Sequence, residues 1–168
     1  MRKYLFIIIA LVVFVLPVKS QQNSSNLQVK LLTLNELEQR IAKGKDTTYV
    51  VNFWATWCGP CVEELPYFEK LSTENAKKPF KVILISLDFK SKLKTAVIPF
   101  VVKNKIKAEV YVINEIDQQK YIDRIDKNWS GAIPATLILN TAKKVRGFYE
   151  QAFTYEQLTK AISTLVKP

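Results

Sequence analysis

The sequence predicts one α/β domain behind a short amino-terminal leader, and three observations support this prediction. The chain has 168 residues, a length that suits a single domain. Its 48% hydrophobic and 24% charged residues are ordinary for a folded globular protein. From about residue 27 onward, runs rich in β-branched and aromatic residues alternate with segments whose apolar residues recur at helical spacing. Such alternation is typical of an α/β domain.

The first part of the chain has the pattern of a secretory signal peptide. Arg2 and Lys3 precede an unbroken apolar run over 4–16, and Ser20 is a small residue at a suitable cleavage position. The run is shorter than the roughly 20 apolar residues that a membrane-spanning helix needs. The alternative is an uncleaved anchor at the amino terminus. The predicted organisation is a signal peptide over 1–20, a polar linker over 21–26 and a folded domain over 27–168.

The domain is expected to begin with a strand, a helix and a second strand. A short strand over 27–32 comes first. A helix then begins near Leu34, because apolar residues recur at helical spacing, and Gly44 is expected to end it. The run over 49–54 is strongly apolar, so we expect it to form a central strand.

The middle of the domain is expected to hold a long helix, a core strand and a broken helix. The long helix begins at the two cysteines and runs toward Asn75. Pro66 lies inside it and should kink it, because the proline ring removes a backbone hydrogen bond. An apolar strand is expected over 80–87. The segment 90–105 is expected to be helical, with a break or a late start at Pro99.

The carboxyl-terminal part of the domain is expected to hold three strands and two helices. A strand over 109–113 precedes a short helix over 117–125. A strand over 135–139 is expected to pair with an edge strand over 144–149. Thr154 is a suitable N-cap for a last helix. The apolar face of this helix would consist of Leu158, Ile162 and Leu165.

Charge and composition exclude several classes of function. The net charge is +10, but the lysines are scattered, and no basic stripe interleaved with aromatic residues is present. We therefore expect a basic soluble surface and no nucleic-acid partner; the alternative is a preference for acidic partners or an anionic membrane face. We also expect a monomeric protein. The chain contains no histidine, which excludes histidine-dependent catalysis and histidine-based metal or haem ligation.

The segment Trp57-Cys58-Gly59-Pro60-Cys61 contains the two cysteines of the chain. It follows an expected buried strand and opens an expected helix, whose amino terminus favours a thiolate at Cys58. Gly59 and Pro60 suit a tight turn into the first helical turn. Cys61, one turn further on, is placed to attack a mixed disulfide formed on Cys58. This pattern indicates a pair that cycles between dithiol and disulfide.

Two other interpretations of the cysteine pair are weaker. A purely structural disulfide between Cys58 and Cys61 would close so short a loop that it would contribute only ~2 kcal/mol. A zinc or iron–sulfur site would need two more ligands, and the chain has neither histidine nor further cysteine. We therefore expect no metal and no cofactor apart from the redox-active disulfide.

The run over 51–61, VNFWATWCGPC, resembles the active-site segment of thioredoxin-like proteins, and more narrowly of the exported TlpA/ResA type of thiol–disulfide oxidoreductase. The run over 131–136, GAIPAT, resembles the cis-proline loop of the same superfamily. The resemblance covers about residues 30–166. It implies a thioredoxin-like fold, with a central mixed β-sheet flanked by helices on both faces. It also implies a cis peptide bond before Pro134.

The resemblance further implies roles for the residues around the cysteines. Cys58 would be the attacking thiol and Cys61 the resolving thiol. A substrate chain would be held in an extended pose beside the disulfide by Ile133 and Pro134. Trp57, whose alternative role is plain packing, would contact the substrate together with Gly59 and Pro60.

The resemblance also singles out polar residues near the cysteines. Glu64 matches the active-site glutamate of the ResA type, which would have a raised pKa and exchange a proton with Cys61. The alternative is a solvated helix residue, the role that we expect for Glu63. Asn52 stands where ordinary thioredoxin carries a buried aspartate, so it cannot titrate. Trp129 is expected to pack.

The function that the resemblance implies is reduction of disulfides in exported proteins, in the periplasm or at the outer face of the inner membrane. Electrons would come from a membrane thiol donor, and the haem-binding cysteine pair of apocytochrome c is one candidate substrate. The close alternative is an oxidase or isomerase of protein disulfides. A non-enzymatic metal carrier on the same fold is less favoured, because such carriers usually have a histidine beside the cysteine pair.

Overall fold

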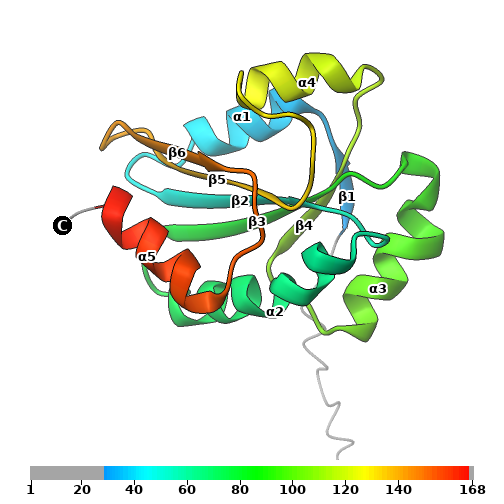
Figure 1. The fold of residues 1–168 in the computed structure, drawn as a ribbon, viewed down its shortest axis with the longest axis horizontal. Coiled ribbons are helices and arrows are strands. Elements are labelled where there is room, and N and C mark those ends of the chain that lie inside the picture. Colours follow the sequence, from blue (N-terminus) through cyan, green and yellow to red (C-terminus); the bar gives the residue numbers. More distant parts are fainter. Residues whose placement is uncertain (1–28, 167–168) are drawn as a thin grey trace, which may run out of the picture.

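The computed structural model describes residues 29–166 (Figure 1). The predicted signal peptide over 1–20 and the predicted linker over 21–26 lie outside the described residues. Within the described part of the chain, no helix is both long enough and apolar enough to cross a membrane.

A six-stranded mixed sheet forms the centre of the domain, with the strand order β1-β4-β3-β2-β5-β6. Strands β1, β4, β3 and β2 run parallel to one another, whereas β5 is antiparallel to β2 and β6 is antiparallel to β5. The strands are β1 (Lys30–Leu32), β2 (Thr48–Trp54), β3 (Phe80–Ser86), β4 (Glu109–Ile113), β5 (Ala135–Asn140) and β6 (Val145–Tyr149). Each lies where a strand was predicted, with small differences at the ends.

Helices cover both faces of the sheet, with α1 and α4 on one face and α2, α3 and α5 on the other (Figure 1). The helices are α1 (Leu34–Ala42), α2 (Gly59–Glu74), α3 (Ile98–Lys103), α4 (Gln118–Ile125) and α5 (Tyr155–Leu165). Thr154 caps α5 as predicted, and its side chain accepts the backbone N–H of Gln157. The arrangement confirms the predicted α/β fold class.

The two helical layers exist because successive side chains of a strand point to opposite faces of a sheet. Every residue of β2 is buried, as expected for a central strand. Val50 and Trp54 belong to the core beneath α2, α3 and α5, whereas Val51 and Phe53 belong to the core beneath α1 and α4. The sheet is therefore buried on both faces at its centre.

Two prolines lie within helical segments and have different surroundings. Helix α2 continues through Pro66 to its end at Glu74. The segment predicted to be helical over 90–105 is divided into a short 3₁₀ turn, a π turn and α3. Pro99 lies in the first turn of α3, directly after the π turn Leu93–Val97. The helical segment thus starts at Lys90 and changes its helix type just before this proline, which agrees with the predicted break and not with a late start.

The sheet topology brings four chain segments to one edge. Strands β2, β3 and β4 are parallel and end together, with Trp54 paired to Ser86 and Ser86 paired to Val112. Strand β5 is antiparallel to β2 and begins at this edge, where Ala135 pairs with Phe53. We call this side of the sheet the carboxyl edge. The segments that follow β2, β3 and β4, and the one that precedes β5, all meet there.

Candidate active site

The two cysteines form a disulfide at the start of α2, just beyond the end of β2. Cys58 is the N-cap residue, and its Sγ accepts the backbone N–H of Cys61 at 3.3 Å. Cys58 retains 6% of its surface exposed, whereas Cys61 is fully buried. An incoming sulfur can therefore reach Cys58 more easily, and the free N–H groups of the first helical turn stabilise a thiolate there.

The segment before β5 places the second predicted motif beside the disulfide. The peptide bond between Ile133 and Pro134 is cis, which confirms the prediction. The Sγ atom of Cys58 lies 3.8 Å from the carbonyl oxygen of Ile133. The two motifs, 75 residues apart in the sequence, thus meet at the carboxyl edge.

Glu64 lies one helical turn beyond Cys61 on α2 and has only 2% of its surface exposed. Its Oε1 accepts a hydrogen bond from Asn52 Nδ2 at 2.8 Å, and its Oε2 accepts the backbone N–H of Phe153 at 2.7 Å. Burial raises the pKa of Glu64 to about 7, although both hydrogen bonds act to lower it. The solvated alternative is therefore wrong for Glu64, whereas Glu63 is exposed as expected.

Asn52 connects Glu64 to the start of β5. Its Nδ2 also donates to the hydroxyl of Thr136 at 3.2 Å, whereas its Oδ1 is buried without a hydrogen-bond partner. An amide carries both a donor and an acceptor, and a half-turn of the side chain exchanges them. Asn52 is therefore able to donate to an ionised Glu64 and to accept from a protonated one.

Asp88, two residues beyond β3, was not identified from the sequence. Its carboxylate accepts the backbone N–H of Thr56 at 2.9 Å and the hydroxyl of Thr56 at 2.6 Å. It also accepts the hydroxyl of Ser86 at 2.7 Å. These bonds tie the turn before the disulfide to the end of the neighbouring strand. The available signal was the position of an aspartate directly after an apolar strand, at the edge where sites of α/β sheets form.

The structure separates the remaining predicted residues into exposed and buried groups. Trp57, Gly59 and Pro60 are exposed beside the disulfide. Nothing lies within 4 Å of the point where a Cβ on Gly59 would stand, so this position is open. Trp129 is buried, packs against Phe53, and donates its indole N–H to a backbone carbonyl. The expectation that Trp129 packs is confirmed.

Among residues 29–166, no cluster of three or more histidine, cysteine, aspartate or glutamate side chains is arranged to hold a metal ion. The reactive groups that the structure places at the start of α2 are the sulfur pair and, one helical turn further along, the buried acid Glu64. These groups suffice for thiol–disulfide exchange, which needs a reachable thiolate, a resolving thiol and a proton acceptor.

Comparison with known proteins gives matches of several kinds. A family model described as Redoxin matches residues 21–161. The thiol-disulfide oxidoreductase ResA of Oceanobacillus iheyensis is 37% identical over 68 residues, which is 40% of this chain and 32% of that protein. The thioredoxin-like protein YneN of Bacillus subtilis is 35% identical over 74 residues, which is 44% of this chain and 41% of that protein. These matches thus span between about a third and two fifths of the curated relatives' lengths.

A solved structure gives a match to the fold. The thioredoxin-related protein of Neisseria meningitidis serogroup B superposes with a TM-score of 0.61 at 22% sequence identity. The match covers 72% of this chain and 86% of the other. It supports the same fold for both chains.

Proposed function

This chain belongs to the redoxin family, and from that membership we propose that it is a thiol–disulfide oxidoreductase that reduces disulfides in other proteins. The observation that carries the proposal is the disulfide between Cys58 and Cys61 at a helix amino terminus, beside the cis bond before Pro134. The buried acid Glu64, one turn further along the helix, completes the set of groups that the reaction needs.

The proposed reaction has two exchange steps. The thiolate of Cys58 attacks one sulfur of a substrate disulfide, forms a mixed disulfide with it, and displaces the other substrate sulfur as a thiolate. The thiolate of Cys61 then attacks the Sγ of Cys58 and releases the first substrate sulfur. Two electrons pass to the substrate, which leaves as a dithiol, and the Cys58–Cys61 disulfide forms again. A thiol donor must then reduce that disulfide.

The second step requires that buried Cys61 lose its proton, and we propose that the carboxylate of Glu64 accepts it. Positions three apart on a helix lie on the same face, so the carboxyl and the thiol are neighbours. Its pKa of about 7 lets Glu64 accept or return a proton near neutral pH. Asn52 accommodates both protonation states through its amide.

The substrate is proposed to lie over the exposed surface of the cysteine turn. Trp57 has 70% of its surface exposed and supplies an apolar contact. The open position at Gly59 leaves room for a polypeptide backbone, with Pro60 beside it. On the other side of the disulfide, the backbone at Ile133 and Pro134 would hold the substrate chain in an extended form.

We further propose that the protein is exported and acts in the periplasm or at the outer face of the inner membrane. The support is the leader pattern over 1–20 together with the similarity to a ResA protein. The electron source would be a thiol donor in the membrane, and apocytochrome c is a candidate substrate. An oxidase or isomerase would use the same cysteine pair, and the reduction potential separates these roles.

The cysteine roles are tested by two single substitutions. Cys58→Ser is expected to abolish reduction of a disulfide-bonded protein substrate, because it removes the attacking sulfur. Cys61→Ser is expected to retain the first step and to accumulate a mixed disulfide, visible on a non-reducing gel. Turnover that survives Cys58→Ser would refute the mechanism.

The role of Glu64 is tested by the pH dependence of the second exchange step. Glu64→Gln is expected to slow release of the mixed disulfide and to remove an inflection near pH 7, because the amide cannot accept the proton of Cys61. Glu63→Gln is the matched control, since Glu63 is an exposed acid on the same helix. Equal profiles for the two variants would exclude Glu64 from proton transfer.

A further inference from the structure

Three exposed apolar side chains occupy equivalent positions along the carboxyl edge. Trp57, Phe89 and Ile116 each stand three residues beyond the end of a strand, namely β2, β3 and β4. Their exposed fractions are 70%, 73% and 100%, so all three side chains are largely open to solvent. Exposed apolar side chains that gather in one place mark interaction sites. Because these strands are parallel neighbours, the three residues form a row that leads away from the disulfide. We call it the apolar row.

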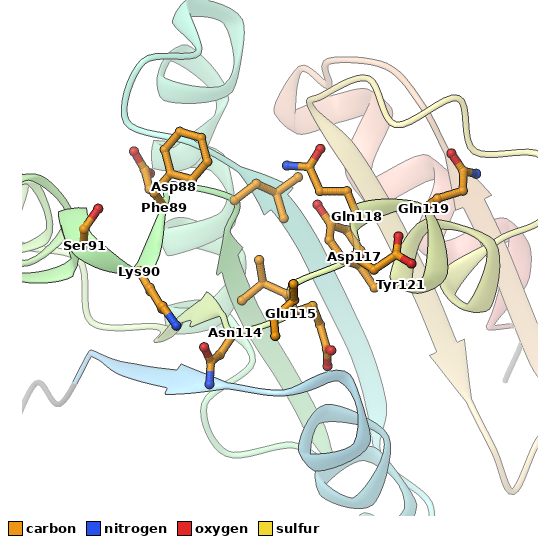
Figure 2. A pocket seen from close by; sticks show the side chains of 13 residues that line it. Asp88, Phe89, Lys90, Ser91, Asn114, Glu115, Asp117, Gln118, Gln119 and Tyr121 are labelled. Carbon is orange, nitrogen blue, oxygen red and sulfur yellow. The ribbon is translucent and has the colours of Figure 1, made fainter.

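A cleft of about 880 Å³ lies between the outer two members of the row. Phe89 stands on one wall, and the opposite wall includes Ile116 and the start of α4. Figure 2 shows Phe89 and Lys90 on one side of the cleft and Gln118 on the other. The cleft is therefore bounded by the segments that follow β3 and β4.

The cleft lies at a point where the chain connections diverge. The chain leaving β3 passes to α3 on one face of the sheet, and the chain leaving β4 passes to α4 on the other face. Open α/β sheets bind ligands at such points, just outside the carboxyl ends of the strands. The position of the cleft is thus one at which this architecture leaves space for a ligand.

The position of Phe89 relative to Cys58 is held by hydrogen bonds. The backbone N–H of Leu87 donates to the carbonyl of Trp54 at 2.7 Å, and the carboxylate of Asp88 binds the turn at Thr56. The segment that carries Phe89 is therefore tied to the segment that carries the attacking sulfur. A surface held in this way binds without a large loss of conformational entropy.

The exchange reaction at Cys58 determines where the substrate polypeptide lies on this surface. The substrate sulfur must reach the Sγ of Cys58, and Ile133 lies on the β5 side of that atom. A polypeptide that extends to the opposite side crosses β3 and then β4. Neighbouring strands are about 4.8 Å apart, so β4 lies roughly 10 Å from β2, which is about three residues of extended chain.

We propose that Phe89 and Ile116, which stand on opposite sides of the cleft, bind an apolar side chain of the substrate polypeptide, about three residues from the cysteine that Cys58 attacks. The proposal rests on the proposed function and adds a specificity element to it. The occupant is the substrate chain itself, because the row is continuous with the cysteine turn through Trp57. The other exposed large apolar residues of the described chain, Leu31, Tyr67 and Val102, lie on β1, α2 and α3 and not on this edge.

The test uses short peptides whose single cysteine is disulfide-bonded to thionitrobenzoate, which is released as a coloured thiol. Two peptides carry phenylalanine three residues before or three residues after the cysteine, and a third carries serine at both positions. The reduced full-length protein is expected to react about tenfold faster with one phenylalanine peptide than with the serine peptide. Phe89→Ser and Ile116→Ser are each expected to lose most of that preference.

Two controls separate docking from chemistry. Val102→Ser removes an apolar side chain that is 62% exposed on α3, and it should leave the preference unchanged. The small disulfide dithiobis(nitrobenzoate) has no polypeptide chain that could reach Phe89 or Ile116. Phe89→Ser and Ile116→Ser should therefore reduce it at the wild-type rate. Retention of the full preference in both variants, or its absence in the wild type, would overturn the docking proposal. Failure of the wild type to reduce any of these disulfides would instead overturn the proposed function.

Discussion

Two buried carboxylates lie on either side of the cysteine turn, and they differ in the groups that surround them. Asp88 has 4% of its surface exposed and accepts three hydrogen bonds, from the backbone and hydroxyl of Thr56 and from the hydroxyl of Ser86. Glu64 has 2% exposed and accepts two hydrogen bonds, from Asn52 and from the backbone of Phe153. For Glu64 the desolvation outweighs these bonds, so its pKa rises to about 7.

The difference shows how one residue class supplies two functions. The bonds of Asp88 hold together the segments that follow β2 and β3, so its contribution is to the geometry of the edge. The carboxyl of Glu64 is able to change protonation near neutral pH, and it lies next to the sulfur that must lose a proton. The two carboxylates also differ in what their hydrogen bonds join: those of Asp88 join the segments around the ends of β2 and β3, and those of Glu64 join α2 to β2 and to the segment before α5.

The largest expected effect is loss of stability in Asp88→Ala. The substitution leaves the N–H of Thr56 and two hydroxyl groups without their acceptor, which is expected to lower the free energy of unfolding by about 4 kcal/mol. Asp88→Asn keeps one acceptor oxygen and should cost about half as much. Denaturant unfolding of the oxidised protein measures both values. If the free energy of unfolding of Asp88→Ala lay within about 1 kcal/mol of the wild-type value, Asp88 would not anchor the turn.

A smaller effect is expected in the pH dependence of stability, because Glu64 titrates at a higher pH in the folded protein than in the unfolded chain. The pKa of Glu64 is about 7 in the folded protein against 4.5 as the ordinary value. A carboxyl whose pKa is raised by folding stabilises the protein fully below pH 4.5, and this contribution is lost as the pH rises toward about 7. The loss should approach about 3 kcal/mol across that range.

Glu64→Gln should remove this pH dependence, because its amide does not titrate. The matched control is Glu63→Gln, which changes an exposed acid and should retain the wild-type dependence. The measurement is the free energy of unfolding at several values between pH 4 and pH 8. Parallel curves for wild type and Glu64→Gln would mean that folding does not raise the pKa of Glu64.

The smallest effect concerns Asn52, whose hydrogen bond lowers the pKa of Glu64. Asn52→Leu removes that bond from the buried carboxylate at similar side-chain size, so the pKa of Glu64 should move further upward. The midpoint of the pH-dependent loss of stability should therefore shift to higher pH than in wild type. A midpoint that stays in place or moves to lower pH would mean that the hydrogen bond from Asn52 does not lower the pKa of Glu64.

Local pattern was sufficient to predict most of the fold. Apolar runs located every strand, Thr154 marked where the last helix begins, and Pro99 marked the break in the helical segment over 90–105. The cysteine pair and the cis bond before Pro134 were predicted from two short motifs. These features depend on neighbours in the sequence or on a motif that resembles a family, so they can be predicted from one sequence alone.

The contacts that the sequence did not predict join distant parts of the chain. Asp88 binds Thr56 across 32 residues, and Phe153 donates to Glu64 across 89 residues. Neither partner has a periodic or spacing signal, because each contact depends on how loops meet at the sheet edge. The raised pKa of Glu64 was expected from the family motif, but its backbone donor was not.

The reduction potential of the Cys58–Cys61 pair at pH 7 decides between a reductase and an oxidase or isomerase. The protein is equilibrated with thiol–disulfide buffers, and free thiols are then counted after alkylation. The proposed reductase is expected to show a single two-electron transition, in which both thiols are lost together on oxidation, at about −250 mV or below. A potential between about −120 and −180 mV would contradict the proposed reductase and favour an oxidase or isomerase.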